Sequence, residues 1–361
     1  MFPQALGIDI SKAWFDVVLL PRDDGSSGNR GRLSASAPSV ITPAKPLHKR
    51  FANVPEGFRQ LAAWLTRTGA DQVHACLEAT GTYGEAIALF LHEQGHTVSV
   101  VNPAQTYHFA QSQLSRTKTD KADAELIARF CQLHRPPAWT PPAAELRELQ
   151  ALVRRLDALL DLRQTERNRL AAGPSAETVR ESIQAVLTFL EGEIASLRRH
   201  IRAHFDSHPE LREQRDLLTS IPGIAEISAT AILAEVGDVA QFTGARQVAA
   251  FAGLAPKLRQ SGSSVRGRAT LPKRGSSRLR HALYFPAVTA LRCNPVIRAM
   301  AERLKGNGKA KMAVLGAAMR KLLHLAYGVL KSGKSFDPAH PVASVIDAAV
   351  RKSIIHVAAG T

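Results

Sequence analysis

The hydrophobic pattern of residues 5–20 (ALGIDISKAWFDVVLL) predicts two short β-strands joined by a tight turn. Every second residue of the first strand is apolar, and these residues share one face: Leu6, Ile8 and Ile10. The opposite face carries Gly7, Asp9 and Ser11. Asp9 therefore lies halfway along a strand in which burial is expected. Because burying an unpaired carboxylate is costly, this position requires a partner that compensates its charge.

The rest of the first 140 residues alternates between helix and strand patterns. A polar stretch rich in Gly, Ser and Pro, residues 23–46, predicts a long loop. Strands are expected at 48–53, 72–79 and 96–101, and helices at 55–69, 84–95 and 119–134. Thr119 is a suitable N-cap for the last of these helices. A strand hairpin followed by alternating helices and strands predicts an α/β fold, with a mixed sheet flanked by helices.

A proline-rich stretch at 134–144 (HRPPAWTPPAA) marks a boundary, after which the pattern becomes heptad-like. Two long amphipathic helices separated by AAGPSAE (171–177) predict an antiparallel hairpin or coiled coil. The first helix has apolar seam positions at Leu149, Val153, Leu156, Leu160 and Leu170, interrupted by Arg163 and Arg167. The second has them at Val179, Ile183, Val186, Leu190, Ile194, Leu197 and Ile201. Such an arm serves either as a spacer or as an oligomerisation element.

The segment from residue 213 onward predicts a mainly helical unit. Its stretch LLTSIPGIAEISATAILAEVG (217–237) resembles a helix-hairpin-helix element, in which a Pro-Gly turn directs backbone N–H groups at a phosphate. Ala225 and Glu226 follow the turn where a second glycine is usual, so a purely structural turn is an equal alternative. The pattern thus divides the chain into residues 1–140, 141–212, 213–335 and a tail, 336–361.

The distribution of charge changes this picture more than the composition does. The chain has 361 residues, a hydrophobic content of 45% and a formal net charge of +16. Between Lys257 and Lys334 there are 18 Lys and Arg residues against a single acid, Glu302. The remaining residues carry 29 basic and 30 acidic side chains. One segment therefore holds the whole excess, which favours a polyanionic partner such as nucleic acid over an ordinary solvated surface.

Several features argue against a membrane or secreted protein. No apolar run reaches the roughly 18 residues that a membrane span needs. The first residues lead directly into a strand pattern, without a basic leader and a cleavage site. The three cysteines, Cys76, Cys131 and Cys293, are far apart and form no CxxC pair. A cytoplasmic protein whose thiols are packing residues is therefore expected.

Four acids are placed where a mixed sheet brings distant positions together: Asp9, Glu78, Asp120 and Asp123. Asp120 and Asp123 are three residues apart on one predicted helix, so they project from the same face. Converging carboxylates suit hard divalent cations. Two Mg²⁺ ions roughly 4 Å apart would stabilise the attacking and leaving oxygens of a phosphoryl displacement. The alternative is that these acids are ordinary surface groups, and that Asp120 simply begins a helix.

Three short motifs, GIDISK, LEATGTYG and KTDKADA, occur in this order along the chain. They resemble the Asp-Glu-Asp-Asp signature of the DEDD transposases of bacterial insertion elements, the insertion-sequence-110 family. The resemblance implies an RNase H-like, RuvC-like fold for the N-terminal domain. It also implies that Asp9, Glu78, Asp120 and Asp123 are catalytic and bind magnesium, with two ions per site.

The segment QSGSSVRGRATLPKRGSSRLRHALY (260–284) contains no acid. Its basic residues, together with Arg259 directly before it, are candidate nucleic-acid contacts: Arg259, Arg266, Arg268, Lys273, Arg274, Arg278 and Arg280. The segment is similar to the family's C-terminal signature, a Ser-Gly pair followed by basic residues, which makes Ser261 the implied nucleophile. The chain departs from that signature at 272–274, where it reads Pro-Lys-Arg. Chemistry alone leaves open Ser263, Ser264, Ser276 and Ser277, with His281 as a conceivable base, and also a phosphate-contacting role for Ser261.

The resemblance implies a transposase that cuts and rejoins DNA in the bacterial cytoplasm, associated with the nucleoid. Its partners would be donor and target double-stranded DNA, a structured noncoding guide (bridge) RNA, and further copies of itself, in a dimer that becomes a tetramer. Three alternatives share parts of this pattern. They are a pilin-type DNA invertase, a metal-dependent nuclease or resolvase that uses water, and a nucleic-acid-binding protein with an inactive RNase H-like domain.

Overall fold

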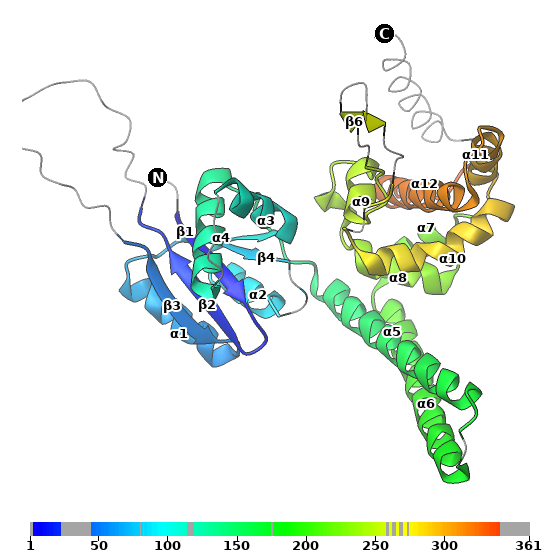
Figure 1. The fold of residues 1–361 in the computed structure, drawn as a ribbon, viewed down its shortest axis with the longest axis horizontal. Coiled ribbons are helices and arrows are strands. Elements are labelled where there is room, and N and C mark those ends of the chain that lie inside the picture. The colour runs from blue at the N-terminus through cyan, green and yellow to red at the C-terminus, as the bar shows by residue number, and fades with distance from the viewer. Residues whose placement is uncertain are drawn as a thin grey trace, which may run out of the picture. The chain divides into compact units, whose positions relative to one another are not determined.

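The computed structural model describes residues 3–22, 45–79, 81, 83–113, 119–174, 176–257, 260–261, 265–266, 270–272 and 274–339 (Figure 1). The chain divides into two compact units, Met1–Pro141 and Pro142–Thr361. They are called the N-terminal unit and the C-terminal unit below, and each is described by itself.

The N-terminal unit is built on a five-stranded mixed sheet with the order β3-β2-β1-β4-β5. Its strands are β1 (Gln4–Ile10), β2 (Trp14–Leu19), β3 (Leu47–Ala52), β4 (Val73–Glu78) and β5 (Thr97–Val101). The first three strands pair antiparallel, whereas β1, β4 and β5 pair parallel. The mixed sheet predicted from the alternating pattern is confirmed, and it fits an RNase H-like α/β fold.

The two faces of this sheet bury different residues, as the alternation in β1 predicts. Leu6 and Ile8 pack with α1 (Pro55–Arg67) and α2 (Glu85–Glu93) on one face. The other face is covered by α4 (Asp120–His134). At Gly7 the strand and α4 approach so closely that a Cβ atom would lie 2.1 Å from the carbonyl oxygen of Ala124. Helix α4 therefore rests directly on the face of β1 that carries Asp9.

The sequence pattern did not predict one helix of this unit. Helix α3 (Pro103–Ser112) follows β5, begins with a proline and is capped by the Asn102 side chain, whose oxygen accepts from the Ala104 N–H. Only Thr106 and Phe109 of its residues are buried, so its apolar stripe is too narrow to be recognised as amphipathic. Cys76 and Cys131 are buried in the core, as expected of packing residues, whereas Cys293 is exposed, and all three are free.

The C-terminal unit begins with two long helices, α5 (Ala144–Ala171) and α6 (Glu177–Ser207), joined by a short turn. Leu159 packs against Leu190 and Ile194, and Arg167 forms an ion pair with Glu191 at 2.9 Å, so the helices run antiparallel. The predicted seam does not hold along its whole length, because the side chains of Val179 and Val186 are exposed. The coiled-coil geometry stays a prediction.

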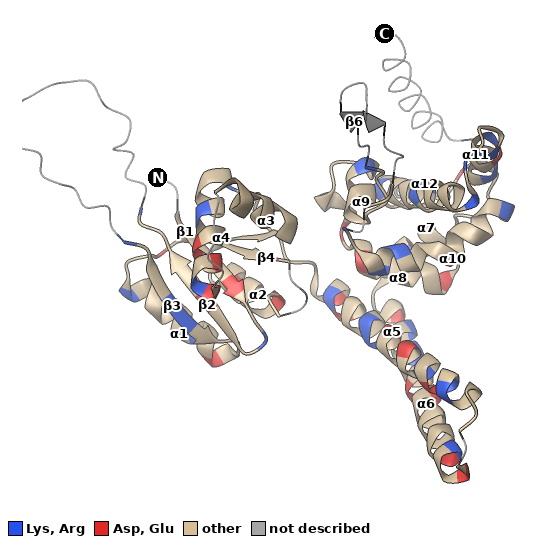
Figure 2. Cartoon of the chain, in the orientation of Figure 1, with Lys and Arg blue, Asp and Glu red and all other residues tan. Residues whose placement is uncertain are grey.

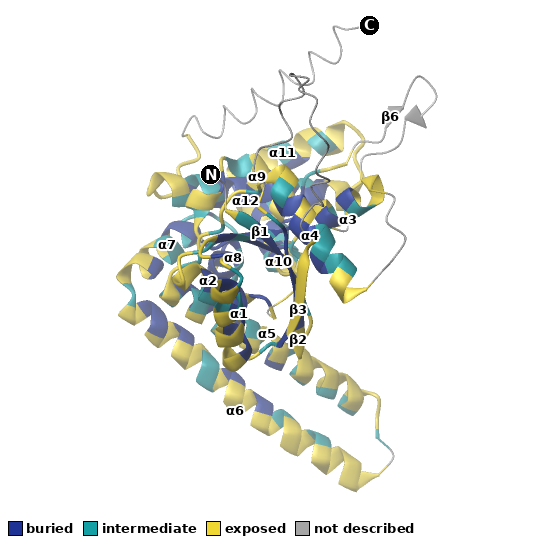
Figure 3. Cartoon of the chain, turned by 90° about the vertical axis from the view of Figure 1, so that its left-hand side faces the viewer, coloured by how far each residue is buried: buried dark blue, intermediate teal, exposed yellow. Residues whose placement is uncertain are grey.

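The remaining helices form a single hydrophobic core together with the base of this hairpin. They are α7 (Pro209–Thr219), α8 (Glu226–Val236), the 3₁₀ turn η2 (Val239–Gln241), α9 (Ala245–Phe251), α10 (Ser277–Cys293), α11 (Pro295–Gly306) and α12 (Lys311–Ser332). Among the described residues, α12 is the one helix long and apolar enough to cross a membrane. However, 61% of its most apolar window is buried within the protein, so it packs as a core helix (Figure 3).

The Pro-Gly turn between α7 and α8 packs against α10. Gly223 has a φ of +107°, and a Cβ atom there would lie 2.6 Å from the Cβ of Ala290 in α10. The Asn294 side chain donates to the Pro222 carbonyl at 3.2 Å. These contacts support the structural interpretation of this turn.

Candidate active site

Three charged residues form a row across neighbouring strands of the N-terminal sheet. In the antiparallel pairing, Asp9 of β1 is opposite Asp16 of β2, and Asp16 is opposite Arg50 of β3. Directly opposed residues in antiparallel strands point to the same face. This is the face on which α4 lies, so the row begins a polar site beneath that helix.

The start of α4 adds two carboxylates to this row. Thr119 caps the helix, as predicted, with its hydroxyl oxygen accepting from the Ala122 N–H at 3.2 Å. The cap makes Asp120 the first residue of the helix and leaves Asp123 one turn further on, in the first turn. Acidic positions accordingly gather where α4 meets the strands (Figure 2).

Glu78 is the last residue of β4, and the helix that the sequence did not predict holds its side chain. Its Oε1 accepts a hydrogen bond of 2.5 Å from the Thr106 hydroxyl of α3. Thr106 is fully buried, so this donor is fixed in place. The Thr106 hydroxyl also lies 2.9 Å from the Pro103 carbonyl, so it joins the end of β4 to the first turn of α3.

The other three predicted acids act on Asp9 electrostatically. The pKa of Asp9 is raised to about 6, first by burial and then by the charges of Asp123, Asp120, Glu78 and Asp16. Like charges close to a carboxyl group disfavour its ionised form, and burial acts in the same direction. A cation placed among these groups would relieve both effects. Their role as metal ligands stays a prediction.

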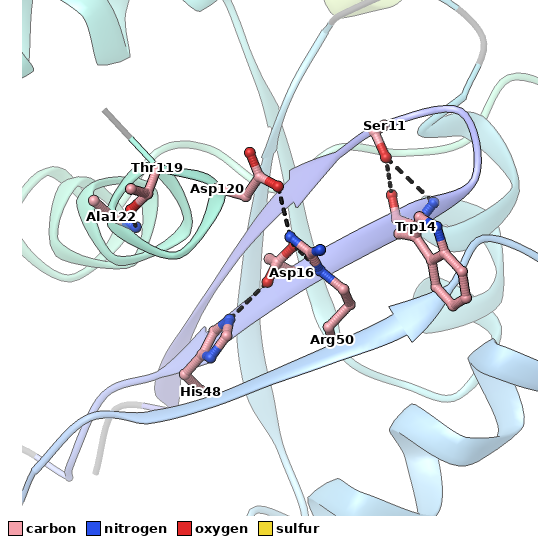
Figure 4. Close-up of polar contacts among 8 residues, drawn as sticks. All are labelled: Ser11, Trp14, Asp16, His48, Arg50, Thr119, Asp120 and Ala122. Atoms are coloured by element: carbon pink, nitrogen blue, oxygen red, sulfur yellow. Dashed lines mark hydrogen bonds and ion pairs between the residues drawn. The ribbon is translucent and has the colours of Figure 1, made fainter. Parts of the chain in front are cut away.

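Sequence reasoning missed the partners that compensate a fifth acid, Asp16, which is only 3% exposed. His48 Nε2 donates to Asp16 Oδ1 at 2.6 Å, and Arg50 Nε donates to Asp16 Oδ2 at 2.8 Å (Figure 4). The guanidinium of Arg50 also reaches Asp120, donating from Nη2 to Oδ2 at 2.6 Å. The period-two pattern of β2 could have indicated that Asp16 is buried and needs a partner, because it places Asp16 on the same face as the buried Val18.

The chemistry of this donor set fits a hard divalent cation, because every candidate ligand is a carboxylate oxygen. Asp9, Glu78, Asp120 and Asp123 are the residues that would hold it. Within the part of the chain that the structure describes, no three His, Cys, Asp or Glu side chains are grouped closely enough to hold an ion. The four acids influence the pKa of Asp9, but the described side chains are not gathered around one point.

The basic segment rises from the C-terminal unit as a small antiparallel ribbon. Strand β6 (Gln260–Ser261) pairs with β7 (Val265–Arg266), and Lys257 bridges to Thr270 further down. Ser261 is opposite Val265 in this register. Of Ser261 and Arg266 only the backbone is described. The predicted contacts at Arg259, Arg268 and Lys273 lie outside the described residues, as do Ser263 and Ser264.

Two other residues of this region have structural contacts. Arg280 Nη1 donates to the carbonyls of Ala252, at 3.0 Å, and Arg274, at 3.3 Å, and so ties the base of the ribbon together. Ser276 caps α10 by accepting from the Leu279 N–H, and it donates to Glu235 at 3.0 Å. Its hydroxyl is thus engaged in holding a helix end. Arg278, by contrast, is largely exposed on α10.

Comparison with known proteins shows to which family the chain belongs. A DEDD transposase profile of the IS110 group, described as Transposase, matches residues 6–172, and the profile Transposase IS116/IS110/IS902 family matches residues 215–302. The Pilin gene-inverting protein of Moraxella bovis is 33% identical over 80% of this chain and 89% of its own length. The chain belongs to the IS110 family of DEDD transposases. A Probable family 20 transposase of Pseudomonas aeruginosa is 32% identical over 65% of this chain and 77% of its own length.

Membership of the IS110 family makes the protein a DNA transposase or recombinase. Dependence on divalent metal ions is general for DEDD transposases, and DNA is their substrate. All three acidic motifs fall within the first matched region, and Ser261 falls within the second. An uncharacterized 43.6 kDa protein of insertion element IS110 in Streptomyces coelicolor is also similar, at 28% identity over 44% of this chain and 38% of its own length.

Proposed function

We propose that this IS110 protein is the transposase of a bacterial insertion sequence, and that it cuts and rejoins DNA through the Ser261 hydroxyl. Asp9, Glu78, Asp120 and Asp123 would hold Mg²⁺, with two ions per site. The metal site is supported most directly by the geometry that places Asp9 on the sheet face covered by α4, the helix that carries Asp120 and Asp123. The charges of the other acids raise the pKa of Asp9, and a bound cation would relieve that repulsion.

The proposed step exchanges one phosphoester bond for another. Ser261 Oγ attacks a backbone phosphorus, an Oγ–P bond forms, and one P–O ester bond of the DNA breaks. The serine proton passes to a base or to water, and the departing deoxyribose oxygen takes up a proton. Rejoining reverses these events with a new strand end. The bound cations would supply positive charge to the phosphate and to the departing oxygen.

The basic segment would hold the nucleic-acid backbones on which this chemistry acts. Lys and Arg side chains contact phosphates without regard to sequence. Sequence choice would then be delegated to base pairing with a structured bridge RNA, as the family resemblance implies. Because the acids and Ser261 lie in different units of the chain, we further propose a composite site between protomers, in a dimer that becomes a tetramer during strand exchange.

The test compares Ser261→Ala with Ser277→Ala, a matched control at the exposed first residue of α10. Both are incubated with element-end DNA and Mg²⁺, and covalent protein–DNA adducts are separated under denaturing conditions. Ser261→Ala is expected to form no adduct while binding DNA normally, whereas Ser277→Ala forms adducts. Normal recombination by Ser261→Ala would exclude the serine mechanism. If it cleaves DNA but forms no adduct, and Asp9→Asn does not cleave, the protein is a nuclease that uses water.

A second candidate function is site-specific DNA inversion, favoured by the similarity to the Moraxella bovis Pilin gene-inverting protein along most of the chain. The same residues would act, and only the arrangement of the DNA sites would differ. A plasmid carrying two inverted sites and a plasmid carrying a complete element distinguish the two. Inversion without element excision or insertion would favour the second candidate.

A further inference from the structure

Arg50 connects a buried carboxylate with an exposed one. Its Nε donates to Asp16 Oδ2 at 2.8 Å, and its Nη2 donates to Asp120 Oδ2 at 2.6 Å. The Asp16 side chain is 4% exposed, whereas that of Asp120 is 64% exposed. One guanidinium therefore links the interior of the sheet to the first residue of α4 (Figure 4).

The inner half of this link is rigid. Both oxygens of Asp16 are engaged, Oδ1 by His48 and Oδ2 by Arg50, so this carboxylate has its charge compensated within the sheet. The cross-strand pairing of Asp16 with Arg50 fixes their backbones relative to each other. A planar guanidinium holds its donors in a fixed fork, which an ammonium group cannot do. Asp16 thereby sets the direction in which Arg50 presents its second donor.

The outer half of the link, the contact between Arg50 and Asp120, restrains a side chain that would otherwise rotate freely. Asp120 lies at the helix start, and its exposed carboxylate has little packing to restrain it. Arg50 engages one oxygen, Oδ2, and the other oxygen, Oδ1, would serve as the ligand. Groups that orient metal ligands in this way commonly change metal affinity by about 10- to 100-fold when they are removed.

We propose that Arg50, anchored by Asp16, is a positioning residue that holds Asp120 for the divalent cation. This inference rests on the proposed metal-binding role of the four acids. It has two competitors. Arg50 could merely tie β3 to α4, or it could compete with the cation for Asp120. The three roles predict different metal affinities, because removing a competitor tightens binding and removing a structural tie leaves it unchanged.

The experiment measures Mn²⁺ binding to the full-length protein by titration, without DNA, in the wild type, Arg50→Ala and Arg50→Lys. Arg50→Ala is expected to weaken Mn²⁺ binding about tenfold. Arg50→Lys keeps the charge but provides a single donor point, so part of the affinity should return. The matched control is Arg59→Ala, which removes an exposed ion pair with Glu56 on α1 and should leave affinity unchanged. Unchanged or tighter binding by Arg50→Ala would overturn the proposal.

Two further variants keep the test decisive. If Arg50→Ala fails to fold because it leaves Asp16 buried with one partner fewer, the double variant Asp16→Asn with Arg50→Ala removes the buried charge. It should show the same tenfold loss, and wild-type affinity in this variant would overturn the proposal. Asp9→Asn tests the proposed function separately. Wild-type Mn²⁺ affinity in Asp9→Asn would refute the metal site itself, whatever Arg50 does.

Discussion

Asp9 and Asp16 face each other directly across the β1–β2 pair, two carboxylates in one cross-strand position. Like charges in this relation destabilise a sheet unless one is compensated. The structure compensates Asp16 with His48 and Arg50, and leaves Asp9 to bear the unfavourable charge of its neighbours. Asp9 is therefore the residue at which the proposed metal site costs stability.

The first prediction is that Asp9→Asn stabilises the metal-free protein at neutral pH. Folding raises the pKa of Asp9 from its ordinary value of 3.8 to about 6, so the folded state binds the extra proton. Stability therefore falls as pH rises from about 4 to 6. The shift alone corresponds to at most about 3 kcal/mol. Because Asp9 is only partly buried, solvent screening reduces the expected gain to about 1 kcal/mol.

The measurement is urea unfolding in a chelator between pH 4 and pH 8. All three tryptophans (Trp14, Trp64 and Trp139) lie in the N-terminal unit, so their fluorescence reports on this unit alone. The difference between Asp9→Asn and the wild type should be absent near pH 4 and reach its full size above pH 6. Asp71→Asn, an exposed substitution in the same unit, is the control. A destabilised Asp9→Asn at pH 8 would contradict the assignment.

The second prediction concerns the contact between Thr106 and Glu78. Thr106→Val keeps the shape of the side chain but removes the hydroxyl that donates to Glu78 Oε1. Glu78 then loses its fixed orientation, and we expect DNA cleavage to slow about tenfold, in line with other groups that orient metal ligands. Thr106→Ser restores the donor and should restore most of the rate. Equal rates for the Val and Ser variants would show that the contact has no part in catalysis.

The sequence predicts the strands of the N-terminal unit well because their signal is local. Alternation in residues 5–20 and helical periodicity in 119–134 each require only neighbouring residues, and both elements form as expected. Helix α3 escaped prediction because a helix that buries just two side chains has almost no periodic signal. Because Thr106 lies on α3, its contact with Glu78 could not be predicted either.

The link from Asp16 to Asp120 could not be predicted, for a different reason. It depends on the register of β3 against β2, which places Arg50 opposite Asp16. Local patterns do not fix strand register across the long connection between these strands. The same limit applies to the helical hairpin, where the seam predicted at Val179 and Val186 has no partner that buries it. Long-range pairing, and not local propensity, decides these positions.

The third prediction concerns the base of the β6–β7 ribbon. Gly275 has a φ of +98°, and a Cβ atom there would lie 2.5 Å from the Gly253 nitrogen. Gly275→Ala must therefore strain the backbone and push apart the two ends of the ribbon. We expect the C-terminal unit to lose about 2 kcal/mol of stability and the proposed adduct formation by Ser261 to fall.

A matched control for this variant is available in α6. Gly192 is helical and a Cβ atom there would contact nothing within 4 Å, so Gly192→Ala should stabilise the protein by about 0.5 to 1 kcal/mol. Urea unfolding followed by circular dichroism compares the two variants. A Gly275→Ala protein as stable as the wild type would mean that this close approach does not exist.

The last prediction separates binding from chemistry. The Arg278 side chain is 53% exposed at the start of α10, where it forms a long ion pair with Glu235 at 4.0 Å, and we expect it to contact a phosphate. Arg278→Ala should weaken DNA binding equally for all sequences and lower the slope of log affinity against log salt by about one. Arg180→Ala, on the helical hairpin, is the matched loss of a basic residue and should leave the slope unchanged. Filter binding over a range of salt concentrations measures both. Asp9→Asn should keep the wild-type slope while abolishing cleavage, because the proposed role of its carboxylate is to bind the metal ion and not to contact the DNA backbone.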